Sequence, residues 1–449
     1  MSDRPASGYT SLDVRAFRIQ MVVAFLSVTA IAGTRPTTTY RALDLGADTF
    51  QVGLVQSAFS VLPALTAVAL GRWIDRHGAG RPYTVALIVL MAGGLVSALA
   101  NDLARLAIGQ ALVGFGGIGA FISGQAMVIA RSRRADWNKR YGTYAAALSL
   151  GQLVGPSLAA AIQSVPELGH ESERVVFLGG AALAVIAASL TGLIPAGRAP
   201  TPPATEEEGR FGPTIRRVLS RPGMVVAMIV SISVASTIDV LAAYLPIYGT
   251  VTGLSVPFVG LLLSIRAGAT ILSRVGMDAL INRFGWQRTL VACLAISSAM
   301  LALLPTTAVP VILIAVAAVL GLAIGLTQPM TITWVANQAP RAERGTALAV
   351  RLTGNRVSLL FVPAVMGAVA GSAGVAAVFW ILAAALGFGA LATRTTHLDS
   401  ARGEAAGPAQ GPAQGPAQGP APGAAVAGGA VAGGAVAGGT GGGSSEAPG

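Results

Sequence analysis

The sequence predicts an all-helical membrane protein with twelve transmembrane helices in two halves of six. Three observations support this fold class. Hydrophobic residues make up 53% of the 449 residues and charged residues only 11%, whereas a soluble domain carries about 25% charged residues. Twelve apolar stretches are long enough to cross a bilayer, which takes about 20 residues per helix. Basic residues gather in the polar segments between these stretches, as is typical of membrane proteins.

The first half of the chain, residues 17–195, contains six predicted spans. Each is an apolar run that ends at polar or charged residues, and the runs on either side of residues 101–102 must form an antiparallel hairpin because so little chain separates them. The spans lie near 17–39, 49–71, 83–100, 103–129, 141–163 and 174–195. Residues 1–16 are mostly polar, so we expect a cytoplasmic N-terminal segment without a cleavable signal peptide.

The second half, residues 222–392, follows a linker at 196–221 in which Pro, Thr and Glu interrupt the apolar pattern. The end of the linker, 211–219, fits a short amphipathic helix on the inner membrane surface. Beyond it, six more spans lie near 222–248, 257–279, 287–306, 308–335, 346–369 and 375–392. Residues 393–449 are rich in Gly, Pro and Ala and cannot bury a core, so we expect a disordered cytoplasmic tail.

The distribution of Lys and Arg predicts the orientation of the chain in the membrane. With the N-terminus inside, most of the 30 basic residues fall in cytoplasmic segments. Only four arginines fall at or near the outer side: Arg35, Arg41, Arg105 and Arg174. We therefore expect a multi-pass protein of the inner, cytoplasmic membrane with both termini in the cytoplasm. The net charge of +11 then reflects topology, and we expect no binding to nucleic acid.

The segment between the second and third spans carries a specific motif. It reads Gly71-Arg-Trp-Ile-Asp75-Arg76-His-Gly78-Ala-Gly-Arg81. Gly71 would permit close helix packing, Asp75 can face a helix N-terminus or an arginine, and Gly78 favours a tight turn. This pattern resembles the cytoplasmic motif of the major facilitator superfamily, with one extra residue before Arg81. A weaker copy at 278–285 follows the eighth span and indicates that the two halves are related.

The resemblance implies a fold of two six-helix bundles around a central cavity and a secondary transporter that works by alternating access. The chain shows no ATP-binding motif and no zinc-protease motif, and its three histidines lie in or near loops. We therefore expect no enzyme, cofactor or metal. Channels usually repeat one pore motif around a symmetric oligomer, whereas two different halves fill this one chain, so we do not expect a channel either. The expected partners of this monomeric transporter are a small-molecule substrate, protons and the lipid bilayer.

The fifth span points to a branch of the superfamily. Gly142, Gly151, Gly155 and Pro156 are similar to the motif of the superfamily's antiporters, in particular the drug:proton exchangers. Glycines at this spacing permit close helix packing, and the proline bends the span. The resemblance implies proton-coupled efflux of a drug or metabolite. An importer or uniporter of a sugar, organic acid or other metabolite is the alternative. Gln110 departs from the family's fourth-span pattern, in which a buried arginine is linked to proton coupling.

Ionisable residues within spans are energetically costly and mark functional sites. Asp239 is the one carboxylate deep within an apolar run, and we expect it to carry the coupling proton, with Arg266 and Arg351 holding the substrate. A structural ion pair between Asp239 and Arg266 is the alternative. Because buried arginines outnumber buried carboxylates, an anionic or zwitterionic solute fits better than a cation. The further candidates for the cavity are Arg35, Gln110, Gln125, Gln328, Trp334 and Asn355.

Two other predicted sites also have structural alternatives. Arg351 and its neighbour Arg356 lie toward the cytoplasmic half of the eleventh span and can brace the inner gate instead of binding substrate. Arg35, next to Pro36 in the first span, can reach the outer membrane interface.

Overall fold

The structure is a computed structural model that describes residues 11–132, 136–194, 217, 219–221, 223–339 and 344–396. Three predicted segments lie largely outside the described residues: the N-terminal segment up to residue 10, the linker with most of its amphipathic helix at 211–219, and the tail beyond 396. The helices described below all belong to one compact unit of the chain.

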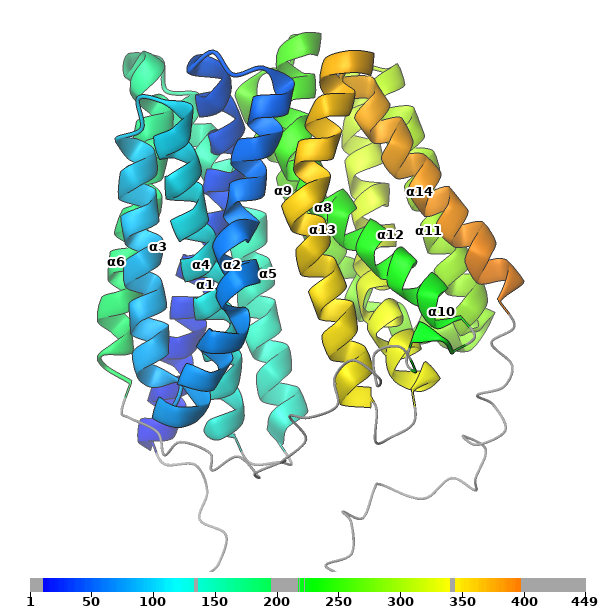
Figure 1. The fold of residues 1–449 in the computed structure, drawn as a ribbon, viewed down its shortest axis with the longest axis horizontal. Coiled ribbons are helices and arrows are strands. Elements are labelled where there is room, and N and C mark those ends of the chain that lie inside the picture. Colours follow the sequence, from blue (N-terminus) through cyan, green and yellow to red (C-terminus); the bar gives the residue numbers. More distant parts are fainter. Residues whose placement is uncertain are drawn as a thin grey trace, which may run out of the picture. The chain divides into compact units, whose positions relative to one another are not determined.

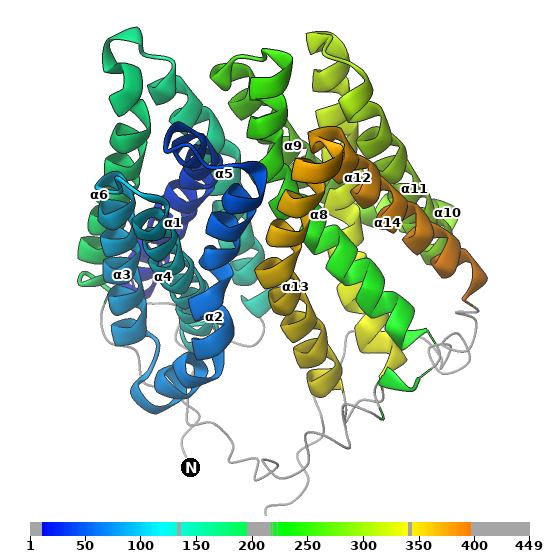
Figure 2. The same ribbon diagram turned by 45° about the horizontal axis from the view of Figure 1, so that its top comes forward.

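Twelve long helices of the described chain form two bundles of six, as predicted (Figures 1 and 2). The first bundle consists of α1 (Ser11–Asp44), α2 (Thr49–His77), α3 (Gly80–Ala98), α4 (Leu103–Ala130), α5 (Trp137–Gln163) and α6 (Ser172–Thr191). The second consists of α8 (Met224–Thr252), α9 (Val256–Val275), α11 (Trp286–Leu303), α12 (Pro310–Gln338), α13 (Arg344–Ala373) and α14 (Val375–Thr395). Three short helices lie in connections within the bundles: η2 (Pro166–Glu171) between α5 and α6, α10 (Met277–Phe284) between α9 and α11, and η3 (Leu304–Thr306) between α11 and α12.

Eleven of the described helices are long and apolar enough to cross a membrane. The twelfth long helix is α2, with 29 residues. It packs against α4 in its own bundle and against α13 of the second bundle. Its polar residues Gln56, Ser57 and Ser60 are buried.

One predicted span is shorter than expected. The run at 257–279 is divided, because α9 ends at Val275 and the separate helix α10 begins at Met277. All eight residues of α10 are at least partly exposed, and they include Asp278 and Arg283. Charged residues at these positions give α10 a polar face, so it connects α9 to α11 as an amphipathic helix.

Glycines with positive φ occupy equivalent turns in the two bundles. Gly78 ends α2 with φ 75° and ψ 167°, and Gly285 ends α10 with φ 85° and ψ 154°. Gly46 before α2 and Gly253 before α9 also have positive φ. Only glycine adopts these conformations without strain, so the recurrence of the same turns supports the relation between the halves that the degenerate motif at 278–285 indicates.

The glycines of α5 bring this helix close to α1. A Cβ atom on Gly155 would lie 2.7 Å from the carbonyl oxygen of Thr29, and one on Gly151 would lie 2.8 Å from that of Phe25. The close packing expected for the fifth-span motif is therefore present at these two positions. A Cβ on Gly142 or on Gly71 would meet nothing within 4 Å, so neither glycine is required for close helix packing in this conformation.

Candidate functional site

The two bundles meet along three helix pairs, α2 with α13, α5 with α9 and α1 with α8. Thr39 donates to the carbonyl oxygen of Ala243 over 2.8 Å, and Thr49 donates to that of Gly367 over 3.2 Å. A 2.7 Å hydrogen bond from Ser157 to Ser264 joins α5 to α9. These three hydrogen bonds between described residues lie near the end of the molecule at which α1 connects to α2 and α5 connects to α6.

An ion pair joins the bundles deeper within the helices. The Nη2 atom of Arg35 on α1 lies 3.4 Å from Oδ1 of Asp239 on α8, and the two side chains are 9% and 28% exposed. The guanidinium stacks over the ring of Phe59 at 4.5 Å and also donates to the carbonyl oxygen of Gln56. The Gln56 amide in turn donates to the Arg35 carbonyl and to Thr39. Residues of α2 therefore hold Arg35 in position toward α8.

Two further arginines lie close enough to Asp239 for electrostatic interaction. They are Arg266 on α9 and Arg356 on α13, both half-buried. Among the described residues neither side chain has an ion pair or a hydrogen bond, and the buried Nε atom of Arg266 has no partner. One carboxylate thus lies within electrostatic reach of three guanidinium groups, which come from α1, α9 and α13. We call Arg35, Asp239, Arg266 and Arg356 the interface cluster.

The structure changes the expected partners of Asp239. The direct partner is Arg35 and not Arg266, and Arg35 faces the second bundle, not the outer membrane interface. Arg356, which the sequence places near the inner gate, belongs to the interface cluster, whereas Arg351 does not show an interaction with Asp239. In the sequence, Arg356 stands out only because it lies inside a predicted span. Arg351 lies in the same span, so the sequence does not distinguish the two arginines.

Arg351 and Asn355 join helices within the second bundle. The Arg351 guanidinium donates to Thr331 of α12 over 3.2 Å, and its Nε atom has no partner among the described residues. Ser231 of α8 donates to the side-chain oxygen of Asn355 over 3.3 Å. Both residues therefore hold α13 against its neighbours, so a role in binding substrate stays a prediction.

The other predicted cavity residues are placed differently. Gln110 is fully buried and donates to Ser97 of α3, so it packs within the first bundle instead of lining a cavity. Trp334 is 2% exposed and packs edge-to-face against Trp286 of α11 with 5.8 Å between ring centroids. Gln125 and Gln328 are half-buried, which is compatible with a position at a cavity wall.

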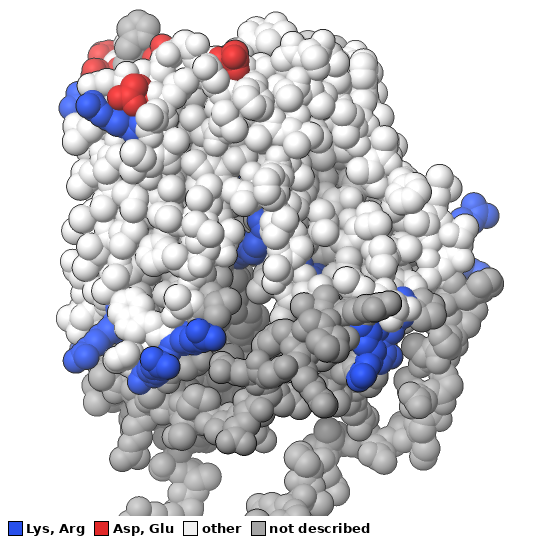
Figure 3. Space-filling view, viewed as in Figure 1, with Lys and Arg blue, Asp and Glu red and all other residues white. Residues whose placement is uncertain are grey.

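The residues of the loop motif lie at the connection between α2 and α3. Gly78 provides the positive-φ turn, and Arg76 and Arg81 are exposed on either side of it. The side chain of Asp75 is outside the described part of the structure. Figure 3 shows acidic side chains at the upper end of the molecule, together with some basic ones, whereas the coloured side chains at the lower end are basic. It also shows basic atoms at mid-height, in the seam between the bundles.

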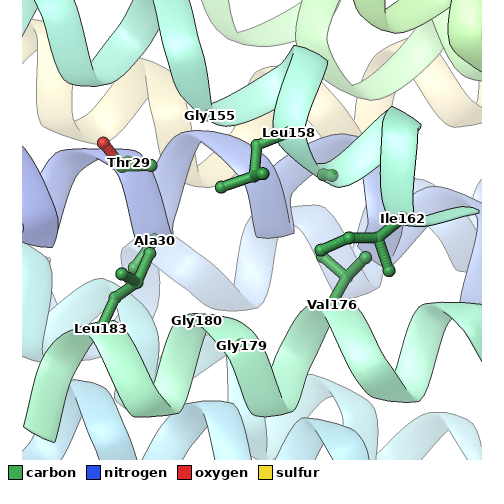
Figure 4. A pocket seen from close by; sticks show the side chains of 11 residues that line it. Thr29, Ala30, Gly155, Leu158, Ile162, Val176, Gly179, Gly180 and Leu183 are labelled. Atoms are coloured by element: carbon green, nitrogen blue, oxygen red, sulfur yellow. The ribbon is translucent and has the colours of Figure 1, made fainter.

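Two apolar cavities lie apart from the interface cluster. One, of about 160 Å³, lies between α1, α5 and α6 and is lined by Thr29, Gly155, Ile162, Val176 and Gly180 among others (Figure 4). The other lies between α5 and α9, where Leu153, Leu158, Leu261 and Leu272 surround the Ser157–Ser264 hydrogen bond. Their lining matches lipid or an apolar group, and neither contains a charged side chain.

Two membrane-embedded helical bundles that meet around a charged cluster define a multi-pass membrane protein of the transporter type. The chain belongs to the Major Facilitator Superfamily, whose family model matches residues 20–308 and 252–439. No curated protein sequence matches the chain significantly.

Solved structures of three transporters share the fold. The nucleoside transporter NupG matches with a TM-score of 0.71 and 16% identity, covering 86% of this chain and 99% of NupG. A bacterial homologue of the human lysosomal transporter Spinster, in an inward-facing and unoccupied conformation, matches with a TM-score of 0.66 and 16% identity over 87% and 98% of the two chains. A POT family transporter bound to a thioalcohol-conjugated peptide matches with 0.65 and 16% over 84% and 95%. At this identity the matches establish the fold alone.

Proposed function

We propose that the chain is a secondary active transporter of the cytoplasmic membrane that exports a small organic solute, a drug or metabolite, in exchange for protons. The observation that carries the proposal is the ion pair between Arg35 and Asp239. In this ion pair a titratable carboxyl group forms part of the contact between the two bundles. A proton on Asp239 removes one charge of the pair, so proton binding and bundle movement are coupled through a single interaction.

The distribution of charge supports an orientation with the α2–α3 connection in the cytoplasm. Arg72, Arg76 and Arg81 lie at this connection, whereas Asp44, Asp48 and Asp102 lie at the opposite ends of the helices. The positive-inside rule then assigns both termini to the cytoplasm. In this orientation the hydrogen bonds from Thr39, Thr49 and Ser157 close the outer side, which corresponds to an inward-facing state.

The ion pair gives a physical route for exchange. In the inward-facing state Asp239 pairs with Arg35, and this pairing favours the charged carboxylate and releases a proton to the cytoplasm. Opening of the outer side separates α1 from α8, so Asp239 loses its direct partner Arg35 and keeps only the weaker attraction of Arg266 and Arg356. Loss of the direct partner favours the protonated form, so Asp239 then takes up a proton from outside. One proton therefore enters for each return of the carrier.

The fifth helix supports efflux as the direction. Gly151 and Gly155 seat α5 tightly on α1, the helix that carries Arg35, and their spacing with Pro156 resembles the antiporter motif. Movement of α5 is thus transmitted to the ion pair. The alternative is an importer or uniporter on the same fold, since nucleoside and peptide-binding transporters share it.

Proteoliposome flux under a pH gradient tests the proposal. A library of metabolites and drugs is first screened for ligands that raise the thermal unfolding midpoint of the purified protein. Each ligand is then added to proteoliposomes that contain a fluorescent pH indicator. We expect the solute and protons to move in opposite directions, and we expect Asp239→Asn to abolish proton movement while the variant remains folded and monodisperse.

The alternatives give different signals in the same assay. Proton movement in the same direction as the solute supports an importer, and flux without proton movement supports a uniporter. Full proton coupling in the Asp239→Asn variant would refute the assigned role of Asp239.

A further inference from the structure

We propose that the transported solute is an organic anion, and that its carboxylate or phosphate group binds between Arg266 on α9 and Arg356 on α13. This assignment of substrate class rests on the proposed transport function. It narrows the solute from any small organic molecule to one with a negatively charged group that can accept hydrogen bonds from two guanidinium groups.

The first argument is the charge of the interface cluster. Arg35 pairs directly with Asp239, and Arg266 and Arg356 also lie within electrostatic reach of this carboxylate, so the empty cluster carries a surplus of positive charge within the membrane-spanning part of the helices. Burial of an unpaired charge is expensive, and a protein keeps such charges where a function requires them. A bound anion is the partner that would compensate this surplus.

The second argument is that only one of the three arginines already has a partner. Arg35 pairs with Asp239, stacks on Phe59 and donates to a backbone carbonyl. Among the described residues, the side chains of Arg266 and Arg356 have neither an ion pair nor a hydrogen bond. Both side chains are half-buried, and the Nε atom of Arg266 is buried without a partner, so their guanidinium groups have donors left for a bound solute.

The third argument concerns the shape of the donors. A guanidinium presents hydrogen-bond donors in a planar fork that matches a carboxylate or phosphate, and such bidentate pairs are strong. Arg266 and Arg356 belong to different helices of the same bundle, so an anion between them stays bound to that bundle while the other moves. Asp239 pairs directly with Arg35, so the donors of Arg266 and Arg356 stay free for the anion.

A cationic solute fits this cluster poorly. Its attraction to Asp239 would compete with the ion pair from Arg35, and it would be repelled by Arg266 and Arg356. The observed arrangement therefore opposes cations and favours anions through the same three positive charges.

Binding of a charge series to the purified full-length protein tests this proposal. The probes are benzoate, benzyl phosphate, benzamide and benzylamine, which share one ring and differ in charge. We expect benzoate and benzyl phosphate to raise the unfolding midpoint with increasing concentration, benzyl phosphate more strongly, and we expect benzamide and benzylamine to have no effect. Calorimetric titration of the same samples gives the dissociation constants.

Variants then locate the site. Arg266→Gln and Arg356→Gln should each weaken benzyl phosphate binding about tenfold to a hundredfold, the usual value of one hydrogen-bonded charge. Arg394→Gln removes an exposed positive charge at the end of α14 and should leave the affinity unchanged. Asp239→Asn removes the competing negative charge and should tighten binding. If a Gln variant does not fold, Arg266→Lys or Arg356→Lys replaces it, with a smaller loss expected because the fork is absent.

Three results would overturn the proposal: tighter binding of benzylamine than of benzoate, unchanged benzyl phosphate affinity in both arginine variants, or no binding of either anion. These measurements need no proton gradient. Anion binding without proton exchange in proteoliposomes would refute the proposed antiport and leave the substrate class intact, whereas proton exchange with a cation would do the reverse.

Discussion

Arg35 and Asp239 are 204 residues apart in the chain, and their contact depends on how α1 and α8 are rotated about their axes. The sequence identifies Asp239 because a carboxylate within an apolar run is costly wherever its helix points. It does not identify the partner, since Arg35, Arg266 and Arg351 all lie within spans and the facing sides of the helices are set by packing. Gln110 illustrates the same limit, because its polarity indicates a cavity whereas its contacts are with Ser97.

Replacement of Arg35 should destabilise the protein, because it leaves the Asp239 carboxylate without its direct partner. In Arg35→Gln the carboxylate of Asp239 loses its direct partner, which we expect to cost about 1–3 kcal/mol. In the double variant with Asp239→Asn no unpaired carboxylate remains, so the two effects should not add. Chemical unfolding of the purified single and double variants measures this coupling. Additive losses would mean that the pair contributes nothing to stability in this state.

Arg266 should behave in the opposite way. The other members of the interface cluster carry a net positive charge, so Arg266 is repelled overall in addition to being partly desolvated. We therefore expect Arg266→Gln to raise the thermal unfolding midpoint, as is common where a residue is kept for function at the expense of stability. Arg394→Gln, which alters only an exposed charge, serves as the control. A lower midpoint for Arg266→Gln than for the control would indicate a structural role.

At the scale of single helices, apolar runs and their polar breaks predict most of the described architecture. They fail where the ends are determined by backbone geometry, as at Gly276, which separates α9 from α10. The fifth-span glycines show what a motif can predict. Their spacing indicates close packing, but only the structure identifies α1 as the neighbour and distinguishes Gly155, which is closely packed, from Gly142, which is open.

The two glycines provide a matched pair of substitutions. A methyl group at Gly155 would lie 2.7–2.9 Å from atoms of Thr29, Ala32 and Gly33, so Gly155→Ala should force α5 away from α1 at a cost of about 1–3 kcal/mol. Gly142→Ala meets nothing within 4 Å and should be neutral or stabilising by up to about 1 kcal/mol, because alanine favours a helix. Unfolding of both variants by denaturant, together with their solute flux, makes the comparison. Equal effects would contradict the packing described for α5.

At the scale of the whole molecule, the sequence predicts two bundles of six helices, and the structure and the family match agree. The sequence does not predict which end of the interface is closed, because the hydrogen bonds that close it involve common residues such as Thr39, Thr49 and Ser157. These residues indicate the closed end only once the structure shows their hydrogen bonds between the two bundles.

A disulfide between α5 and α9 should hold the closed end shut. The side-chain oxygens of Ser157 and Ser264 are 2.7 Å apart, a separation that suits replacement by a cysteine pair. In a Cys293→Ser background, Ser157→Cys with Ser264→Cys should crosslink on oxidation and stop solute flux, and reduction should restore it. The two single variants should continue to transport under the same oxidation. Undiminished flux in the crosslinked protein would show that this contact does not open during transport.

The surplus positive charge at the bundle interface also predicts a transport cycle that is sensitive to voltage. The three arginines and one aspartate of the interface cluster remain net positive when the site is empty. Carrying one elementary charge through the whole field is worth about 2.3 kcal/mol per 100 mV, so an interior-negative potential draws the empty carrier toward its cytoplasm-open state. For a dianionic solute of the proposed class, binding would cancel the surplus, and we expect the loaded carrier to move almost independently of the field. The membrane potential would then act mainly on the return of the carrier without solute.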